Sequence, residues 1–349
     1  MTRVAIGAIM KQEEPYVLEW VAYHKALGFD LIIADNGGTD NTTKILTALD
    51  SAGIIKRIDF RYCTKTPQIP AYRAIIRVAK RLKIDTIGFL DCDEFFARKV
   101  PIMAINPDEG ARYIEKEFQK FDASQISYYW LIYGSRTEQC DINLPVLERF
   151  SYHASIEEQQ KKGIKAFKSF IKVNEMFKLS NIFFLGPIIL SPHYFHGAMR
   201  NWIIDYKRMN VNKYNPGLRI VTHNNGAILH FAIKTWEEFQ IKIARGDAIH
   251  SSNKYGKTYF DNYDMNDVYQ KIDKEVLDTL HLEIEKLKGI VDNFNFGLLK
   301  ILDYDSLYSR LLSVGLLKYG DNKKFRKFKK FILKIKDFYN QILGKGKKQ

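Results

Sequence analysis

Short apolar runs alternate with segments of helical periodicity through the first 95 residues of the chain. In the segments between the runs, apolar side chains recur three and four positions apart, which is the spacing of an amphipathic helix. Short buried strands that alternate with helices are typical of a parallel sheet with right-handed crossovers. The pattern therefore predicts an α/β, Rossmann-like fold. The expected strands are residues 4–9, 31–34, 54–60 and 86–90, and the expected helices are residues 15–27, 45–49 and 68–82.

The alternation becomes less regular after residue 95. Later segments still show strand-like alternation or helical spacing, so further strands and helices are expected there. Residues 144–158 fit either state, and no internal repeat or low-complexity linker divides the chain. The later strands are expected at residues 125–133, 166–173 and 227–231, and the later helices at residues 111–121, 235–245 and 266–290.

One apolar run stops abruptly at three carboxylates, Asp91, Asp93 and Glu94. In open α/β sheets, ligands bind at the carboxyl ends of the strands, which is where these acids are expected. Asp91 and Asp93 lie two positions apart and point the same way if the strand continues. Two such carboxylates suit a divalent cation that also holds a diphosphate. The alternative is a strand end with solvated acidic side chains.

Two further polar loops are expected at the same edge of the sheet. Residues 11–14 follow the first predicted strand, and residues 35–41 follow the second. Neither of these loops, nor residues 91–94, contains the glycine pattern of a dinucleotide fold or of a phosphate-binding P-loop. An acidic crevice without a glycine cradle favours phosphates that are held through a cation.

Charge and cysteine content narrow the class of protein. The net charge is +14, and residues 321–349 contribute +9 of it through 11 Lys or Arg and two Asp. Because the rest of the chain is only weakly basic, the charge does not predict a nucleic-acid groove across the fold. The three cysteines, Cys63, Cys92 and Cys140, are odd in number and lack metal-ligand spacing, which indicates a reducing cytoplasm.

The C-terminal segment has the pattern of a basic amphipathic helix. In residues 325–342, apolar side chains recur at helical spacing, and Lys or Arg occupies most positions between them. Such a helix can lie in the interface of an anionic bilayer, and a helix docked on the protein's own core is the alternative. The sequence shows no apolar run of about 18 residues and no signal peptide. We therefore expect a cytoplasmic protein that is peripheral on the inner face of the plasma membrane.

The first 250 residues resemble the glycosyltransferase family 92-like group, which is related to family 2 within the GT-A fold. The opening motif of that group resembles residues 10–28, MKQEEPYVLEWVAYHKALG. Gln12 stands where the group usually has Asn, and Gly37-Gly38 replaces a more usual polar pair; neither departure touches the acidic site. The resemblance continues through DNGGTD at 35–40, AYR at 71–73, FLDCDEF at 89–95 and LHFAIKTWEEF at 229–239.

The resemblance implies transfer of a sugar from a nucleotide-diphosphate sugar with the help of Mn²⁺ or Mg²⁺. Carried over by position, Asp93 would ligate the metal and Asp91 would face the ribose or the sugar. Asp35 would contact the base or the ribose, with an Asx-turn or helix cap as the alternative. A metal that bridges two phosphates would neutralise the charge that develops on the leaving group. Further donor-site candidates are Glu13 and Asn36 from the two flanking loops and Arg73, which could pair with phosphate or with Asp91.

An inverting transferase also needs a carboxylate that deprotonates the acceptor hydroxyl. Glu148 matches a recurrent segment of the group, and Glu138 and Asp141 follow the strand predicted at residues 125–133. A structural ion pair is the alternative role for Glu148. His230, at the end of a short strand, is the candidate that completes the metal shell, and a buried histidine held by backbone groups is the alternative.

The sequence thus predicts a GT-A glycosyltransferase domain at residues 1–250, a helical extension at 251–320 and a basic amphipathic tail at 321–349. The expected reaction transfers a hexose, galactose by resemblance, from a UDP-sugar to a glycan or glycolipid acceptor with inversion. Nucleic acid is not expected as a partner. Two other classes stay open: a nucleotidyltransferase acting on a sugar phosphate, and a non-catalytic carbohydrate- or membrane-binding protein of the same fold.

Overall fold

The computed structural model describes most of the chain up to residue 294. Glu138 and the tail at residues 321–349 lie outside the described residues, so what the sequence predicts for them stays a prediction. The described residues are 2–61, 67–137, 139, 141–174, 202–204, 206–209, 221–246 and 254–294.

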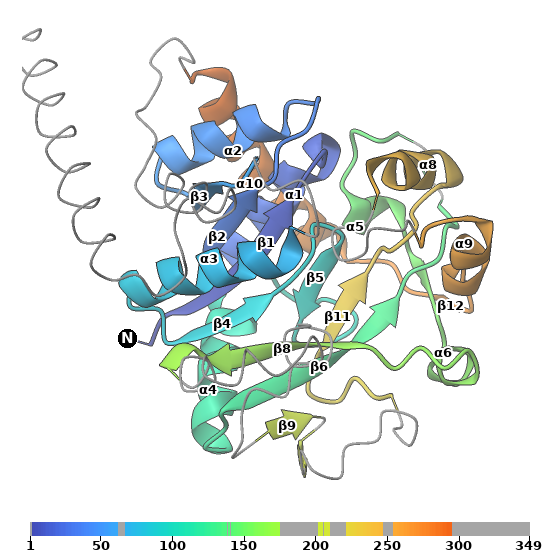
Figure 1. The fold of residues 1–349 in the computed structure, drawn as a ribbon. Helices are drawn as coiled ribbons and strands as arrows, with labels where there is room; N and C mark the ends of the chain where they lie inside the picture. Colours follow the sequence, from blue (N-terminus) through green and yellow to red (C-terminus); the bar gives the residue numbers. More distant parts are fainter. Residues whose placement is uncertain are drawn as a thin grey trace, which may run out of the picture.

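Four parallel strands form one half of a mixed sheet, in the order β3-β2-β1-β4 (Figure 1). In the register of this half, Met10 lies opposite Asp35 and Gly7 lies opposite Phe89. The loops that follow β1, β2 and β4 therefore begin at one edge of the sheet, as the sequence predicts. These strands are β1 (Val4–Met10), β2 (Asp30–Asp35), β3 (Lys56–Asp59) and β4 (Thr86–Phe89).

The other half of the sheet is joined through an antiparallel strand, β8, which pairs with both β4 and β6. Gly88 of β4 allows this close packing, because an added Cβ atom would lie 2.7 Å from the ring of Phe170 on β8. β6 continues the sheet to β9 and β10. These strands are β6 (Gln125–Ile132), β8 (Phe167–Lys172), β9 (Trp202–Ile204) and β10 (Lys207–Met209).

A late strand returns to the acidic stretch. β11 (Ala227–His230) is parallel to β6 and antiparallel to β5 (Glu94–Ala97). Its register sets His230 opposite Glu94, and the backbone N–H of Phe231 donates to the carbonyl of Asp93. The fold thereby brings residues near position 230 beside those near position 93.

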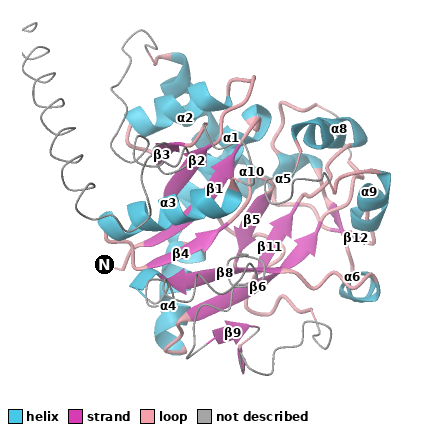
Figure 2. Cartoon of the chain, in the orientation of Figure 1, coloured by secondary structure: helices cyan, strands magenta, loops and turns pink. Residues whose placement is uncertain are grey.

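Helices cover both faces of the sheet (Figure 2). On one face, α1 and α2 pack in a core with Ile6 and Ala8 of β1; on the other, α3 packs in a second core with Ala5 of β1. The alternation along β1 thus separates the two cores, as expected for successive residues of a strand. The helices α1 (Glu14–Ala26), α2 (Thr42–Ser51), α3 (Gln68–Arg81) and α4 (Ala111–Lys120) agree with the sequence pattern.

The helix predicted at residues 266–290 begins later than expected. Residues 268 and 269 form the short strand β12 (Val268–Tyr269), which pairs with β7 (Tyr152–His153), and α10 covers Lys274–Asp292. Pairing with a distant strand has overridden the helical pattern here. Buried residues of α10 join the same core as α1 and α2.

The remaining helices are short and lie toward one side of the sheet (Figure 1). They are α5 (Val146–Arg149), α6 (Ile156–Lys161), α8 (Trp236–Arg245) and α9 (Lys257–Tyr263). Among the described helices, none is both long and apolar enough to cross a bilayer. The α/β fold class that the sequence predicts, a Rossmann-like sheet flanked by helices, is confirmed.

Candidate functional site

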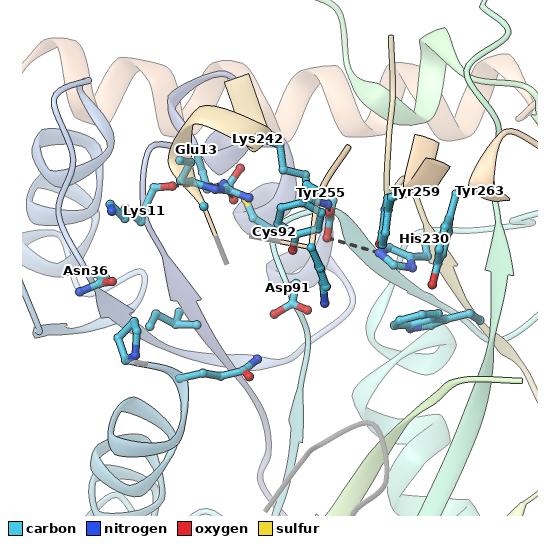
Figure 3. Close-up of a pocket in the computed structure, with 18 of the residues that line it drawn as sticks. Lys11, Glu13, Asn36, Asp91, Cys92, His230, Lys242, Tyr255, Tyr259 and Tyr263 are labelled. Atoms are coloured by element: carbon cyan, nitrogen blue, oxygen red, sulfur yellow. Dashed lines mark hydrogen bonds and ion pairs between the residues drawn. The ribbon is translucent and has the colours of Figure 1, made fainter. Parts of the chain in front are cut away.

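A pocket of about 390 Å³ lies at the carboxyl ends of β1 and β4 and is closed on its far side by residues of α8 and α9. The residues that line it include cationic, acidic and aromatic side chains. In Figure 3, Lys11, Glu13 and Asn36 lie at one end, and His230 and two tyrosines lie at the other. The cationic lining residues are Lys11, Arg61, Lys242, Arg245 and Lys254, the acidic ones are Glu13, Asp91 and Asp93, and the aromatic ones are Trp130, His230, Tyr255, Tyr259 and Tyr263.

The turn at residues 91–94 is held in place by Trp20, which belongs to the opening motif at residues 10–28. The indole N–H of Trp20 on α1 lies 3.0 Å from both the carbonyl of Asp91 and the carbonyl of Glu94, and Trp20 is fully buried. The Glu94 carboxylate accepts from the backbone N–H of Asp91 at 2.8 Å. These bonds give the turn one geometry, so Asp91 and Asp93 both reach the pocket.

Asp93 is paired with a lysine from α8. The Nζ atom of Lys242 lies 2.7 Å from Oδ2 of Asp93 and 2.7 Å from the carbonyl of Ala232. Burial alone would raise the pKa of Asp93, but Lys242 together with the other groups around the carboxylate outweighs burial and holds that pKa well below its ordinary value. Asp93 is therefore ionised, and the positive charge of Lys242 balances its negative charge.

Asp91 and Glu94 share a second lysine. Lys168 of β8 is fully buried, and its Nζ atom lies 2.9 Å from Asp91 and 2.9 Å from Glu94. Burial would lower the pKa of Lys168, but the two carboxylates raise it above its ordinary value. The side chain of Asp91 is 33% exposed, compared with 10% for Asp93, so Asp91 is the more accessible of the two.

His230 lies beside Asp93, as the sequence predicts. Its Nε2 atom is 3.8 Å from Oδ1 of Asp93, and its ring packs 4.1 Å from the ring of Trp130. Burial lowers the pKa of His230 to about 3, so the imidazole is neutral at physiological pH. Its Nδ1 atom has no hydrogen-bond partner among the described residues.

Glu13 is bound by a residue of helix α8, which also carries the lysine that binds Asp93. Its carboxylate forms an ion pair with Arg245 of α8, whose guanidinium also donates to the carbonyl of Lys11 at 3.2 Å. Burial raises the pKa of Glu13, although Arg245 opposes that effect. Asn36 also lines the pocket, and its side-chain amide donates to the carbonyl of Phe60 at 3.0 Å.

Asp35, for which the sequence predicts a donor-site role, does not line the pocket. It is fully buried, and its carboxylate lies 2.6 Å from Nη2 of Arg57 on β3. Its other oxygen accepts from the backbone N–H of Gly37 at 2.9 Å and from the hydroxyl of Thr43 at 3.0 Å. This is the Asx-turn alternative, stabilised by an arginine whose side chain is 13% exposed.

The predicted catalytic bases in the described part of the chain are also outside the pocket. Glu148 of α5 lies 2.7 Å from the imidazole of His281 on α10, and Asp141 accepts from the backbone N–H of Asn143 in an exposed turn. Helix α5 faces this way because the Glu19 carboxylate binds two backbone N–H groups at its first residues. Arg73 is half-buried on α3 and does not line the pocket either.

The described residues do not fit the metal centre that the sequence predicts. They contain no group of three or more His, Cys, Asp or Glu side chains that could hold a metal ion. Asp93 and His230 could supply two ligands, but a lysine neutralises each carboxylate of the Asp-x-Asp pair. The sequence offers no signal for the role of Lys168, whose position on a strand looks like any other.

Comparisons with known proteins identify no family. No family model matches the chain, and no curated protein matches it. Among solved structures, residues 1–349 of S. aureus TarS share 10% identity and a TM-score of 0.30, over 51% of this chain and 49% of that one. The same protein in complex with UDP shares 12% identity and a TM-score of 0.29, over 51% of this chain and 48% of that one. A UDP-glucose pyrophosphorylase complexed with UDP-glucose shares 7% identity and a TM-score of 0.24, over 84% of this chain and 100% of that one.

This chain thus spans about half of the length of the TarS structure that it matches. Likenesses of this size assign neither a family nor an activity. Its own fold and pocket define an α/β protein with a charged and aromatic pocket at the carboxyl edge of a parallel sheet. The family that the opening motif resembles stays a prediction.

Proposed function

We propose that this protein is a glycosyltransferase that moves a hexose from a UDP-sugar to a glycan or glycolipid acceptor. The observation that supports the proposal best is the pair Asp91 and Asp93, which lies in a pocket where cationic side chains outnumber acidic ones, five to three. Galactose as the transferred sugar, and inversion at its anomeric carbon, follow only from the family resemblance.

The charge of the pocket suits a diphosphate leaving group. When the bond between the sugar and the diphosphate breaks, negative charge develops on the phosphate oxygens. Preorganised positive groups stabilise such charge, and they do so more strongly in a partly buried site than in water. Lys242 and Arg245 are held in place by ion pairs before any ligand binds.

The shape of the lining suggests how a donor lies in the pocket. Asn36 and Gln68 offer amide groups beside Ile9 at the end formed by β1 and α3, which suits a nucleobase. Asp91, with one third of its side chain exposed, is placed to contact the ribose or the sugar. The donor would then run from the nucleobase end toward the aromatic end of the pocket.

The aromatic end suits a sugar ring. Tyr259 and Tyr263 are stacked with ring centroids 4.4 Å apart, the ring of His230 packs edge-on 6.2 Å from Tyr263, and Trp130 packs against His230. Aromatic faces bind the apolar side of a sugar while hydroxyl groups reach polar neighbours. Neither Asp141 nor Glu148 lines the pocket, and Glu138 stays the other predicted candidate for the base.

Nucleotide binding separates this proposal from its rivals. The melting temperature of the full-length protein is measured with UDP, with UTP and in buffer, because a ligand that binds only the native state raises it. We expect UDP to raise it, and we expect UDP release from a UDP-hexose in a screen of UDP-sugars. Pyrophosphate release from UTP and a sugar phosphate would instead indicate a nucleotidyltransferase. No nucleotide effect and no UDP release would indicate a non-catalytic binding protein.

Membrane association through residues 321–349 is proposed from the sequence alone. The 11 basic residues of this segment would attract it to an anionic bilayer, and a membrane-bound acceptor would make such binding useful. Binding of the full-length protein to phosphatidylglycerol vesicles is compared with binding of a variant that ends at Gly320. Equal, weak binding of the two proteins would rule the membrane role out.

A further inference from the structure

Helix α8 directs two cations into the pocket from successive turns. Lys242 and Arg245 are three positions apart, so they lie on one face of the helix, and both line the pocket. Each is anchored by a carboxylate that follows a parallel strand: Asp93 after β4 and Glu13 after β1. The helix is thus fastened to the carboxyl edge of the sheet at two points.

The start of α8 is fixed as firmly as its end. Thr235 and Glu238 form a capping box, in which each side chain meets the backbone N–H of the other. Glu238 also receives both terminal nitrogens of the buried Arg149, at 2.8 and 3.0 Å. A helix held in this way presents its cations at fixed positions, and no rearrangement is needed when a ligand arrives.

Both cations keep unused donors that can reach a ligand. A lysine ammonium has three N–H groups, and Lys242 uses two of them, on Asp93 and on the carbonyl of Ala232. Arg245 has five N–H groups, and its contacts with the described residues, Glu13 and the carbonyl of Lys11, involve Nη1. Two neighbouring cationic groups, about one helical turn apart, match the two phosphates of a nucleoside diphosphate.

We infer that Lys242 and Arg245 bind the diphosphate of the nucleotide. The ammonium group of Lys242, bound to Asp93, then supplies the positive charge that the sequence predicts to come from Mn²⁺ or Mg²⁺. Asp93 and Glu13 are then positioning residues, because they hold cations rather than a metal. The inference rests on the proposed function, since it concerns how the same donor is bound. It predicts a transferase whose nucleotide site works without added divalent metal.

UDP binding measured by titration calorimetry tests this inference. The full-length protein is treated with EDTA, and its dissociation constant for UDP is measured with and without Mn²⁺. We expect similar values in both conditions. Lys242→Met should weaken binding at least about tenfold in both, since it removes a charge-assisted hydrogen bond. Lys242→Arg should bind nearly as well as the unchanged protein.

The controls exclude a trivial loss of folding. Lys274→Met disrupts another Lys–Asp pair, with Asp278, but that lysine is 85% exposed on α10 and should leave binding unchanged. If Lys242→Met alone unfolds the protein because Asp93 loses its partner, the double variant Asp93→Asn, Lys242→Met carries neither charge and should fold. It should still bind UDP at least about tenfold more weakly than Asp93→Asn alone.

Asp93→Asn distinguishes a lysine from a metal directly. With lysine as the cation, this variant keeps its affinity for UDP in EDTA, because a negative charge near the phosphates has been removed. UDP binding that requires Mn²⁺ and disappears in Asp93→Asn would overturn the inference and leave the proposed function intact. Absence of UDP binding by the unchanged protein in both conditions would overturn the two together.

Discussion

Asp35 and Asp93 occupy equivalent places in the fold but have different surroundings. Asp35 is the last residue of β2 and Asp93 lies just after β4, at the same edge of the sheet, and as whole residues they are 0% and 8% exposed. Asp35 is bound by Arg57 of the neighbouring strand β3, by Thr43 and by the backbone of Gly37. Asp93 is bound by Lys242, 149 residues away in sequence, on a helix that lines the pocket.

The difference shows that the position of an acid at a strand end does not decide its role. The partners of Asp35 come from the first sheet strands and their loops, so its ion pair is part of the scaffold. The partner of Asp93 arrives from a distant helix and brings a second cation, Arg245, with it. Asp93 therefore reaches the pocket together with its cation, whereas Asp35 is enclosed by its partners.

Replacing Asp35 should produce the largest change in free energy, and that change should be in stability. Asp35→Asn removes the nearest counter-charge of Arg57, whose side chain is 13% exposed, and leaves it, among the described residues, only Asp59 at 4.0 Å. Because breaking a buried pair on one side costs about 3–5 kcal/mol, the loss should approach that range. Urea denaturation of the ligand-free protein measures the loss. UDP affinity at a temperature where the variant is folded should be unchanged.

The matched control for this change is an exposed Asp–Arg pair. Asp108 and Arg112 on the protein surface are each 55% exposed and 3.2 Å apart, so Asp108→Asn should cost less than about 1 kcal/mol. If Asp35→Asn behaved like this control and weakened UDP binding instead, Asp35 would be a ligand-binding residue after all, as the sequence predicts.

Replacing Asp93 should produce the next largest change, and that change should be in transfer. Asp93→Asn no longer fixes the ammonium of Lys242, and loss of one preorganised electrostatic contact costs about 100-fold in rate, or about 2.7 kcal/mol. We expect kcat for sugar transfer to fall by this factor while the KM for the donor changes little. A variant with normal kcat would show that Lys242 needs no anchor.

Acid should weaken the scaffold behind the pocket before it discharges Asp93. His24 of α1 is buried, its Nδ1 donates to the carbonyl of Trp20 and its Nε2 accepts from the N–H of Phe96. Burial lowers its pKa to about 3. A pKa that is lower in the folded state means that this stability is complete above about pH 6.5 and is lost as the pH falls toward 3, by up to about 1.4 kcal/mol per pH unit.

Urea denaturation between about pH 7 and pH 5 measures this slope, and His24→Gln should make it shallower. UDP affinity at about pH 5.5 should change little, because the positive groups around Asp93, Lys242 foremost, hold its pKa well below that range despite burial. A loss of UDP affinity with unchanged stability would place the acid-sensitive group in the pocket instead of the scaffold.

Features that depend on neighbouring residues could be predicted from the sequence, whereas contacts between residues far apart in the chain could not. The run before Asp91 predicted β4, and Trp20, inside the opening motif, proved to fix the turn that follows it. The lysines on Asp91 and Asp93 lie 77 and 149 residues away, and periodicity does not show which distant side chains meet. The ion pair of Asp35 was missed for the same reason, because its partner Arg57 lies on another strand.

A contact between distant residues also decides the surroundings of Glu148, and replacing this residue should have the smallest effect. Its partner is His281 of α10, a helix packed against α1 and α2, so the sequence could not show that this acid faces away from the pocket. The pair is half-exposed, with side chains 21% and 41% accessible, and such pairs contribute about 1 kcal/mol or less. Because Glu148 does not line the pocket, Glu148→Gln should change the initial rate of transfer by less than about twofold. A tenfold fall would mean that Glu148 reaches the acceptor in a conformation that differs from this one.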